Sequence, residues 1–281
     1  MRVLFFDLTL TGVKSRNMQW FLALNEGCPA FKQYADMAKV AIHTARQHTS
    51  LQAHCIYDGG ENDFTAWLKS RAVPILHWRT FLHDDLALLG KETNNPDLLR
   101  ATRGVFLRVE LPALQARLGL DDRVLYTDCD VIFRKEVVGE LRPLQPKFFS
   151  VAAEANAARP DEMNTGVMWM HLPEMRAQDA LFRDYLRQNI AALPGMSWDQ
   201  GAYRNFYRSA KNDPLWDVLP PELNWKPYWD DYGTAKIIHF HGPKPFQRPN
   251  IDSHYSELKH LTGGRYGEVC DLWEALLEEA E

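Results

Sequence analysis

An apolar run in the middle of the chain ends in two carboxylates with one residue between them, in the stretch VLYTDCDVIF that holds Asp128 and Asp130. Alternate side chains of an extended chain point the same way, so both carboxylates can reach one ion while Cys129 turns into the protein wall. Carboxylate oxygens suit Mg²⁺ or Mn²⁺, and the phosphates of a substrate often complete such a site. The same spacing occurs in solvated loops after strands, so the surrounding elements have to decide.

Strand and helix patterns alternate in the part of the chain that leads to the two aspartates. The expected strands are residues 3–6, 52–57, 73–77 and 123–127. The expected helices are residues 34–47, 63–70 and 98–118, the last with a break near Pro112. This alternation predicts an α/β fold with a mainly parallel sheet flanked by helices. Ligands of such sheets bind beyond the carboxyl ends of the strands, where Asp128 lies, and this position favours the metal site.

The remaining elements follow from the same patterns. Residues 148–152, 166–171 and 235–240 are expected to be strands, and residues 174–190 and 199–207 helices. Residues 269–279 form an amphipathic helix that is expected to pack on the body of the protein. Residues 12–30 are expected to be an extra segment before the first helix, whose Trp20, Phe21 and Leu22 need burial. This segment would cover a ligand, shape a second binding site or join two subunits.

Composition limits the function classes. The 281 residues are 25% charged and 46% apolar, which suits one globular domain. The formal charge of −5 and the pI near 6.1 argue against nucleic acid as a partner, since such binders usually carry a basic stripe. The four cysteines form no C-x-x-C pair, which disfavours a zinc site and a disulfide framework and fits a reducing cytoplasm. No apolar run is long enough for a membrane span, so we expect a soluble cytoplasmic protein, with peripheral membrane contact still compatible.

Four stretches in a fixed order carry a resemblance to a known family: RVLYTDCDVIF, NTGVMWMHL, DQGAYRNFY and IIHFHGPKPF. Together they resemble nucleotide-sugar glycosyltransferases, most closely family 8, which is similar to glycogenin and to bacterial lipopolysaccharide galactosyltransferases. The resemblance implies a GT-A fold, a Rossmann-like nucleotide-diphospho-sugar transferase architecture. It implies a UDP-sugar donor, an acceptor hydroxyl on a carbohydrate, glycolipid or other molecule, retention of configuration, and Mn²⁺ or Mg²⁺ as cofactor.

The domain limits implied by the resemblance are those of a single glycosyltransferase domain, residues 1–281. Residues 1–133 form the nucleotide-binding half and residues 134–250 the acceptor and catalytic half. Residues 251–281 form a helical tail, beyond the part of the chain that the resemblance covers.

Metal ligands implied by the resemblance are Asp128, Asp130 and His239. A neutral imidazole is a common ligand for first-row metals, and three protein ligands leave room for diphosphate oxygens. His241 lies two residues further on and is an alternative to His239 as the third ligand, in which case the other histidine is packed or faces the acceptor.

Donor-binding residues implied by the resemblance are Arg108, Gly242, Lys244, Asp7 and Thr9. Gly242 would let the backbone approach the diphosphate and Lys244 would supply a point charge, although Lys244 also fits a solvated loop. This loop departs from the family pattern, because it is one residue shorter and ends in Phe246 where the family has Trp. Asp7 and Thr9 belong to residues 7–11, where the first expected strand would meet the uridine. Arg108 would contact the donor, or else pair with Glu110 or a distant acid.

Catalytic residues implied by the resemblance are Gln200, Asp199 and Asn164. Asn164 would hydrogen-bond the donor sugar, although it also fits a turn before a strand. Asp199 and Gln200 would lie opposite the anomeric carbon, and Asp199 also fits the N-cap of the helix that follows Trp198. Gln200 is a poor nucleophile, so retention is expected through attack of the acceptor from the leaving-group face.

Two alternatives come from other classes. The Asp128 motif also resembles the nucleophile of haloacid-dehalogenase phosphatases, with Asp230 and Asp231 as a later acidic pair. That motif normally opens its domain, whereas three expected strands precede it here. The other alternative is a glycosyltransferase-like module that binds a nucleotide sugar without transferring it, and the intact set of candidate metal ligands argues against it.

Overall fold

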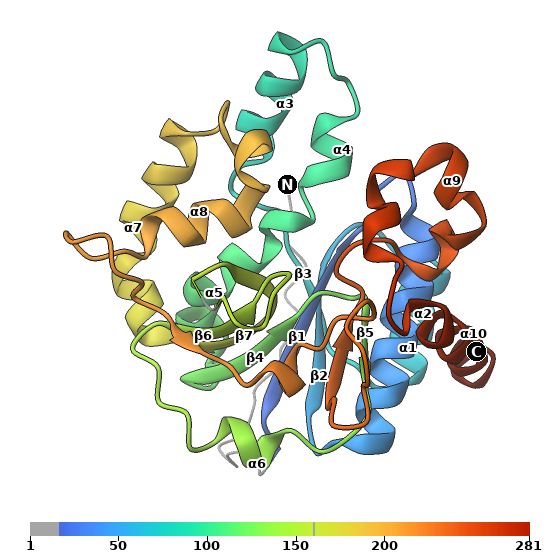
Figure 1. Cartoon of the computed structure of the whole chain (residues 1–281). Helices are drawn as coiled ribbons and strands as arrows, with labels where there is room; N and C mark the ends of the chain where they lie inside the picture. The colour runs from blue at the N-terminus through green and yellow to red at the C-terminus, as the bar shows by residue number, and fades with distance from the viewer. Residues whose placement is uncertain (1–16, 160) are drawn as a thin grey trace.

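The computed structural model describes residues 17–159 and 161–281. The expected strand at residues 3–6 and the candidate residues Asp7 and Thr9 lie outside this part of the chain. The described residues form a central sheet with helices on both faces, so the predicted α/β class is confirmed (Figure 1). The strands of this sheet are β1 (Gln19–Asn25), β2 (Gln52–Asp58), β3 (Ile75–His77), β4 (Arg123–Thr127), β6 (Phe149–Ala153), β7 (Met163–His171) and β8 (Asp217–Val218).

The order of strands in the sheet is β3-β2-β1-β4-β7-β6-β8. Strands β3, β2, β1 and β4 are parallel, β7 is antiparallel to both β4 and β6, and β8 is parallel to β6. The prediction of a mainly parallel sheet is therefore confirmed. The inserted antiparallel β7 has a local consequence, because it brings the start of β7 to the edge of the sheet where β4 ends: Asp128 N donates to Gly166 O at 2.9 Å.

The strand β1 corrects the expected role of residues 12–30. We expected an extra segment there, but residues Gln19–Asn25 form a central strand between β2 and β4. Trp20, Phe21 and Leu22 are fully buried, as expected, but inside the main sheet. An apolar run that ends in Asn25-Glu26-Gly27 is an ordinary strand followed by a turn, and the apolar residues 3–6 had drawn the assignment away from it.

Helices cover the two faces of the sheet because alternate side chains of its strands point to opposite sides. Trp20, Leu22 and Leu24 of β1 pack with α1 and α2, whereas Phe21 and Ala23 pack with η1, α5, α7 and α8 on the other face. The helices are α1 (Phe31–His48), α2 (Asp63–Ser70), α3 (His83–Glu92), α4 (Leu98–Thr102), α5 (Leu111–Leu118), α6 (Val138–Leu141), α7 (Leu172–Gln188), α8 (Trp198–Phe206), α9 (Ile251–His254) and α10 (Tyr266–Ala280). Short 3₁₀ turns include η1 (Val105–Glu110), η4 (Pro245–Asn250) and η5 (Ser256–Leu261).

Most helices begin or end within a few residues of the predicted bounds, and two of the differences change an expectation. The expected helix at residues 98–118 is broken well before Pro112, since α4 ends at Thr102 and the 3₁₀ turn η1 follows. Pro112 lies in the first turn of α5, where a missing N–H is tolerated. Asp199 is not the N-cap of α8, because the helix begins at Trp198 and Ser197 occupies the N-cap position.

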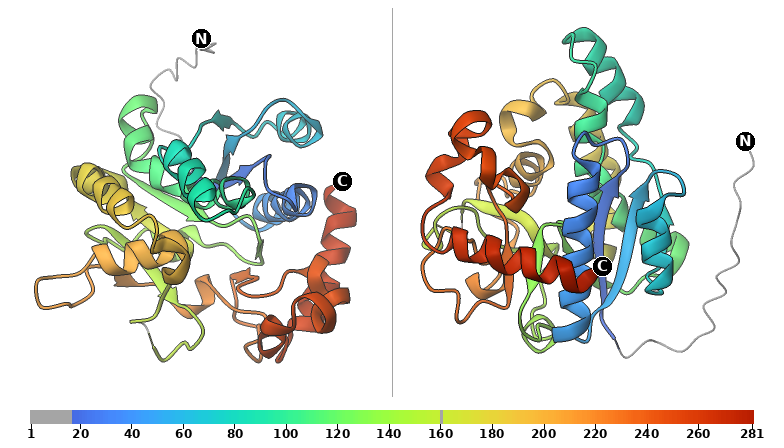
Figure 2. Two further views of the ribbon diagram at one scale, coloured as in Figure 1. Left: turned by 90° about the horizontal axis from the view of Figure 1, so that it is seen from above. Right: turned by 90° about the vertical axis from the view of Figure 1, so that its right-hand side faces the viewer.

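A second, two-stranded sheet joins distant parts of the chain. Strand β5 (Val131–Phe133) pairs antiparallel with β9 (Ile237–His239), and this pairing sets Val131 opposite His239. The helix α10 lies across α1 on the outside of the molecule, as predicted for an amphipathic helix that packs on the body (Figure 2). The residues that follow β9 lie beside Asp130, because Phe240 N donates to Asp130 O and the Lys244 ammonium contacts the Asp130 carboxylate.

Candidate metal and nucleotide site

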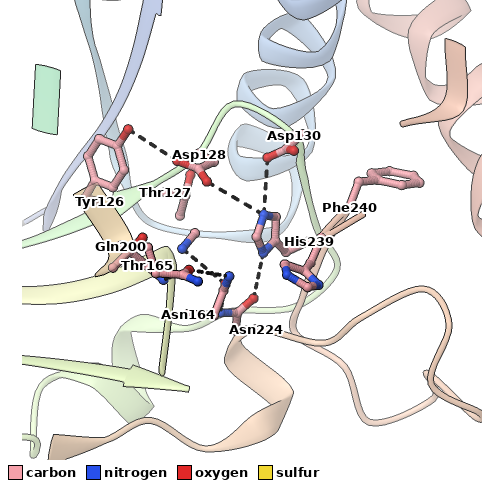
Figure 3. Close-up of polar contacts among 12 residues, drawn as sticks. Tyr126, Thr127, Asp128, Asp130, Asn164, Thr165, Gln200, Asn224, His239 and Phe240 are labelled. Atoms are coloured by element: carbon pink, nitrogen blue, oxygen red, sulfur yellow. Dashed lines mark hydrogen bonds and ion pairs between the residues drawn. The ribbon is translucent and has the colours of Figure 1, made fainter. Parts of the chain in front are cut away.

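Three side chains that could hold a cation meet beyond the end of β4. Ligand atoms of Asp128, Asp130 and His239 all lie within 4.8 Å of one another. His239 Nε2 is 3.8 Å from Asp128 Oδ2 and 3.5 Å from Asp130 Oδ1 (Figure 3). The two aspartates lie in the short turn between β4 and β5, and the pairing of β5 with β9 places His239 next to them. The set of two carboxylates and one imidazole fits a first-row divalent cation.

The other histidine of the motif is not part of this cluster. The Nδ1 atom of His241 is 2.8 Å from the hydroxyl of Tyr228, and its Nε2 is 3.6 Å from Glu154 Oε1. The structure therefore places His239 rather than His241 beside Asp128 and Asp130, as preferred from the sequence.

Lys244 contacts the carboxylate oxygen of Asp130 that His239 does not contact. Its Nζ is 2.5 Å from Asp130 Oδ2 and donates to Phe240 O at 2.5 Å. Burial acts to raise the pKa of Asp130, but the neighbouring Lys244 ammonium holds that pKa well below its ordinary value. The Oδ1 atom of Asp130 is buried and forms no hydrogen bond. Asp130 is therefore held in its charged form, and its Oδ1 has no hydrogen-bond partner, so this oxygen could bind a cation.

Arg108 ties the metal cluster to α8. This buried guanidinium donates from Nη2 to Asp128 Oδ1 at 2.9 Å, and its Nε is 2.7 Å from Asp199 Oδ2. It also donates from Nη1 to Thr165 O and stacks over Tyr126. Burial raises the pKa of Asp199 to about 6 despite Arg108. Arg108 thus orients a candidate metal ligand, and Glu110, the alternative partner considered from the sequence, pairs with Arg183 instead.

Asn164 and Gln200 lie together on the other side of His239. Asn164 Nδ2 donates to Gln200 Oε1 at 3.0 Å, and Gln200 Nε2 donates to Glu154 Oε1 at 2.7 Å. Although burial acts to raise it, His241, Gln200 and Arg204 lower the pKa of Glu154 to about 2. The amides of both candidate catalytic residues are therefore held by protein partners.

A cavity of about 260 Å³ opens beside the cluster, at the carboxyl ends of β1 and β4. The polar or charged residues on its wall include Asn25, Arg108, Asp128, Asp130 and Lys244. The predicted donor-binding residue Gly242 does not line it; it has φ +100°, and a side chain there would collide with Leu261. A polar ligand that carries negative charge fits this combination of cationic side chains and candidate metal ligands.

Several residues of the site were missed in the sequence. The amide oxygen of Asn224 accepts from His239 Nδ1 at 3.0 Å, Glu154 accepts from Gln200, and Asn25 and Cys28 line the cavity. Asn224 lies in LPPELNWKP and Glu154 follows β6, where neither has a partner at a recognisable spacing. The NTG sequence predicts only Asn164 as a site residue, whereas Gly166 lies against the His239 ring.

No protein-family model and no curated protein matches the sequence. Solved structures do match. The galactosyltransferase LgtC, solved with donor and acceptor sugar analogues, aligns over 87% of this chain and 95% of its own, with a TM-score of 0.58 at 14% identity. GlyE of Streptococcus pneumoniae TIGR4 aligns over 94% of this chain and 63% of its own (TM-score 0.58, 14% identity). WbbM, a bifunctional glycosyltransferase, aligns over 84% of this chain and 48% of its own (TM-score 0.55, 15% identity).

The chain has a glycosyltransferase fold. This confirms the predicted GT-A architecture. The chain spans nearly the whole of LgtC but less than two thirds of GlyE and WbbM. Among the helices of residues 17–159 and 161–281, none is long and apolar enough to cross a membrane.

Proposed function

We propose that this chain is a metal-dependent glycosyltransferase that moves a sugar from a UDP-sugar to an acceptor hydroxyl with retention of configuration. One observation carries the proposal: Asp128, Asp130 and His239 meet at the edge of a cavity, within a fold that the chain shares with galactosyltransferase LgtC. The four sequence stretches that resemble family 8 all contribute to this region. The proposed unit is the single domain of residues 1–281.

Asp128, Asp130 and His239 would hold Mn²⁺ or Mg²⁺. Such an ion offsets the negative charge that develops on a diphosphate leaving group. Lys244 would add a positive charge there, since it lines the cavity beside Asp130. Asp7 and Thr9 remain proposed contacts of the uridine, and we add the end of β1, because Asn25 and Cys28 line the same cavity.

For retention, the acceptor oxygen would bond to the anomeric carbon on the face from which the diphosphate oxygen leaves. The acceptor proton would pass to an oxygen of the departing diphosphate, so no protein base is needed. The amide of Gln200 is engaged with Asn164 and Glu154, which supports a positioning role for Gln200 rather than a nucleophilic one. Asp199 is engaged with Arg108 in the same way.

The test is release or transfer of sugar from UDP-sugars with Mn²⁺ and with EDTA. We expect slow hydrolysis of one UDP-sugar with Mn²⁺ alone, and none in EDTA. A phosphatase would instead release inorganic phosphate from phosphomonoesters, and a pure binding module would release nothing. Within residues 17–159 and 161–281 no feature favours the phosphatase, because Asp230 and Asp231 do not line the cavity and Asp231 accepts from Gly233 N. A β-linked product from an α-linked donor would refute retention.

A further inference from the structure

A register shift in β7 leaves two main-chain donors free to bind side chains. Val151 of β6 pairs with Met168, but the next residue, Ala152, pairs with Asn164. The three residues of β7 between Asn164 and Met168 therefore have no paired residue in β6. Such irregularities commonly redirect groups at a site. Here Thr165 N donates to Gln200 Oε1 at 3.1 Å, and Gly166 N donates to Asn164 Oδ1 at 3.2 Å.

These two main-chain donors fix the direction of a row of side-chain amides. A backbone N–H can only donate, so Asn164 and Gln200 must each turn an oxygen toward it. Because its oxygen is then an acceptor, Asn164 receives the Nδ2–H of Asn224 at 2.9 Å. The amide oxygen of Asn224 consequently faces His239 Nδ1, at 3.0 Å.

The backbone of Asn224 is anchored as firmly as its side chain. Its carbonyl oxygen accepts from the buried Lys226 Nζ at 2.9 Å, and its N–H donates to Pro221 O at 3.0 Å. The next residue, Trp225, exchanges main-chain hydrogen bonds with Ile237 and His239 of β9. With its backbone fixed in this way, Asn224 could rotate its side-chain amide by 180° only by breaking its hydrogen bonds to Asn164 and to His239.

We propose that Asn224 and Gly166 are positioning residues that hold His239 in its Nδ1-protonated tautomer, with the Nε2 lone pair presented toward Asp128 and Asp130 for a divalent cation. An acceptor opposite Nδ1 requires the proton there, and Nε2 is then the free ligand atom. Figure 3 shows the ring between Asn224 on one side and the two carboxylates on the other.

Gly166 provides the space for the ring. A Cβ at this position would lie 2.0 Å from His239 Cε1 and 2.6 Å from both ring nitrogens. Relief of this overlap would require the β7 backbone or the ring to move. The backbone is held because Gly166 O accepts from Asp128 N, and the ring is held by Asn224. Each residue of Asn164-Thr165-Gly166 thus contributes to the same imidazole: the first two through the amide row and the third through the absence of a side chain.

The inference rests on the proposed function for the identity of the cation, but the tautomer concerns the metal-free protein. Long-range ¹H–¹⁵N NMR of ¹⁵N-histidine-labelled protein distinguishes the two tautomers, and the signals of His239 are those lost in His239→Gln. We expect a protonated Nδ1 and a bare Nε2 in the metal-free protein. A protonated Nε2 would overturn the proposal without any further variant.

Variants then test the two positioning residues. Asn224→Leu should move the His239 proton to Nε2, where Asp130 accepts it, and weaken Mn²⁺ binding measured by calorimetry about 10- to 100-fold. Asn224→Asp keeps an acceptor opposite Nδ1 and should preserve the wild-type tautomer. Gly166→Ala should weaken Mn²⁺ binding at least as much, whereas Gly139→Ala, at a position with open space, should not.

Two internal controls accompany these measurements. Glu154→Gln changes the far end of the amide row, and the main-chain donors should keep the His239 tautomer unchanged. The tautomer of His241, which contacts Tyr228, should be the same in the wild type and Asn224→Leu. An unchanged tautomer and unchanged Mn²⁺ affinity in Asn224→Leu would refute the role of Asn224. The expected tautomer in a protein that transfers sugar from no UDP-sugar would overturn the proposed function but not the inference.

Discussion

The ion pair of Asp130 with Lys244 is expected to stabilise the metal-free protein, although both residues are proposed to serve ligand binding. Their side chains are only 6% and 16% exposed, and the contact is 2.5 Å. Removing one partner of a buried pair typically costs about 3–5 kcal/mol, because the other charge is left without compensation. Lys244 retains Phe240 O as an acceptor and lines an open cavity, so we expect the lower end, about 3 kcal/mol, for Asp130→Asn and for Lys244→Met alike.

The double variant separates this effect from lost packing. With both charges gone, no charge is left uncompensated, so Asp130→Asn/Lys244→Met should lose less than either single variant, well below the sum of about 6 kcal/mol. The assay is urea unfolding in EDTA at neutral pH, followed by circular dichroism. The exposed pair of Glu61 with Lys69 is the control cycle, for which we expect a coupling below about 1 kcal/mol. Losses at Asp130 and Lys244 that add within about 0.5 kcal/mol would refute the reasoning.

Two further predictions concern the same region. Lys244→Met should bind Mn²⁺ alone more tightly than the wild type, because no ammonium competes with the ion for Asp130. The same variant should bind UDP more weakly in the presence of Mn²⁺, because a positive charge beside the diphosphate is lost. Calorimetry showing that both affinities are reduced would contradict this prediction. Glu154 has its pKa lowered from 4.5 to about 2 in the folded protein, so its ionised form contributes stability that is complete above about pH 4.5 and is lost as the pH falls toward 2. Glu154→Gln should therefore be less stable than the wild type at neutral pH by at most about 3 kcal/mol, and urea unfolding across this range should show the difference narrowing as the solution is acidified.

Much of the fold was predictable because local patterns and tertiary packing agree. The strand at residues 123–127 and the helix at residues 63–70 have the expected bounds, since Asn62 caps that helix and the apolar runs end where turn residues begin. The first strand of the sheet was not predictable in the same way, because two apolar runs, residues 3–6 and Gln19–Asn25, compete for one role. Only the pairing of β1 with β2 and β4 decides between them.

The candidate site was predictable where one short motif holds the chemistry. Asp128 and Asp130 follow from the spacing, and His239 from the resemblance of its motif to a known family. The contribution of Asn224 could not be predicted, since its partner His239 is reached through hydrogen bonds across β9 rather than through a spacing. The role of Gly166 depends on the approach of a ring from another sheet, which no pattern within NTG reports.

The pairing of β5 with β9 also bears on how the chain folds. The cluster draws Asp128 from one part of the chain and His239 from a distant one, so the loop between them must close before all three ligands meet. The proposed cation would find no complete binding site in an early, partly folded chain and would bind only to a nearly native one. The cation would therefore stabilise the native state but not the transition state for folding. It would slow unfolding and leave the rate of refolding unchanged.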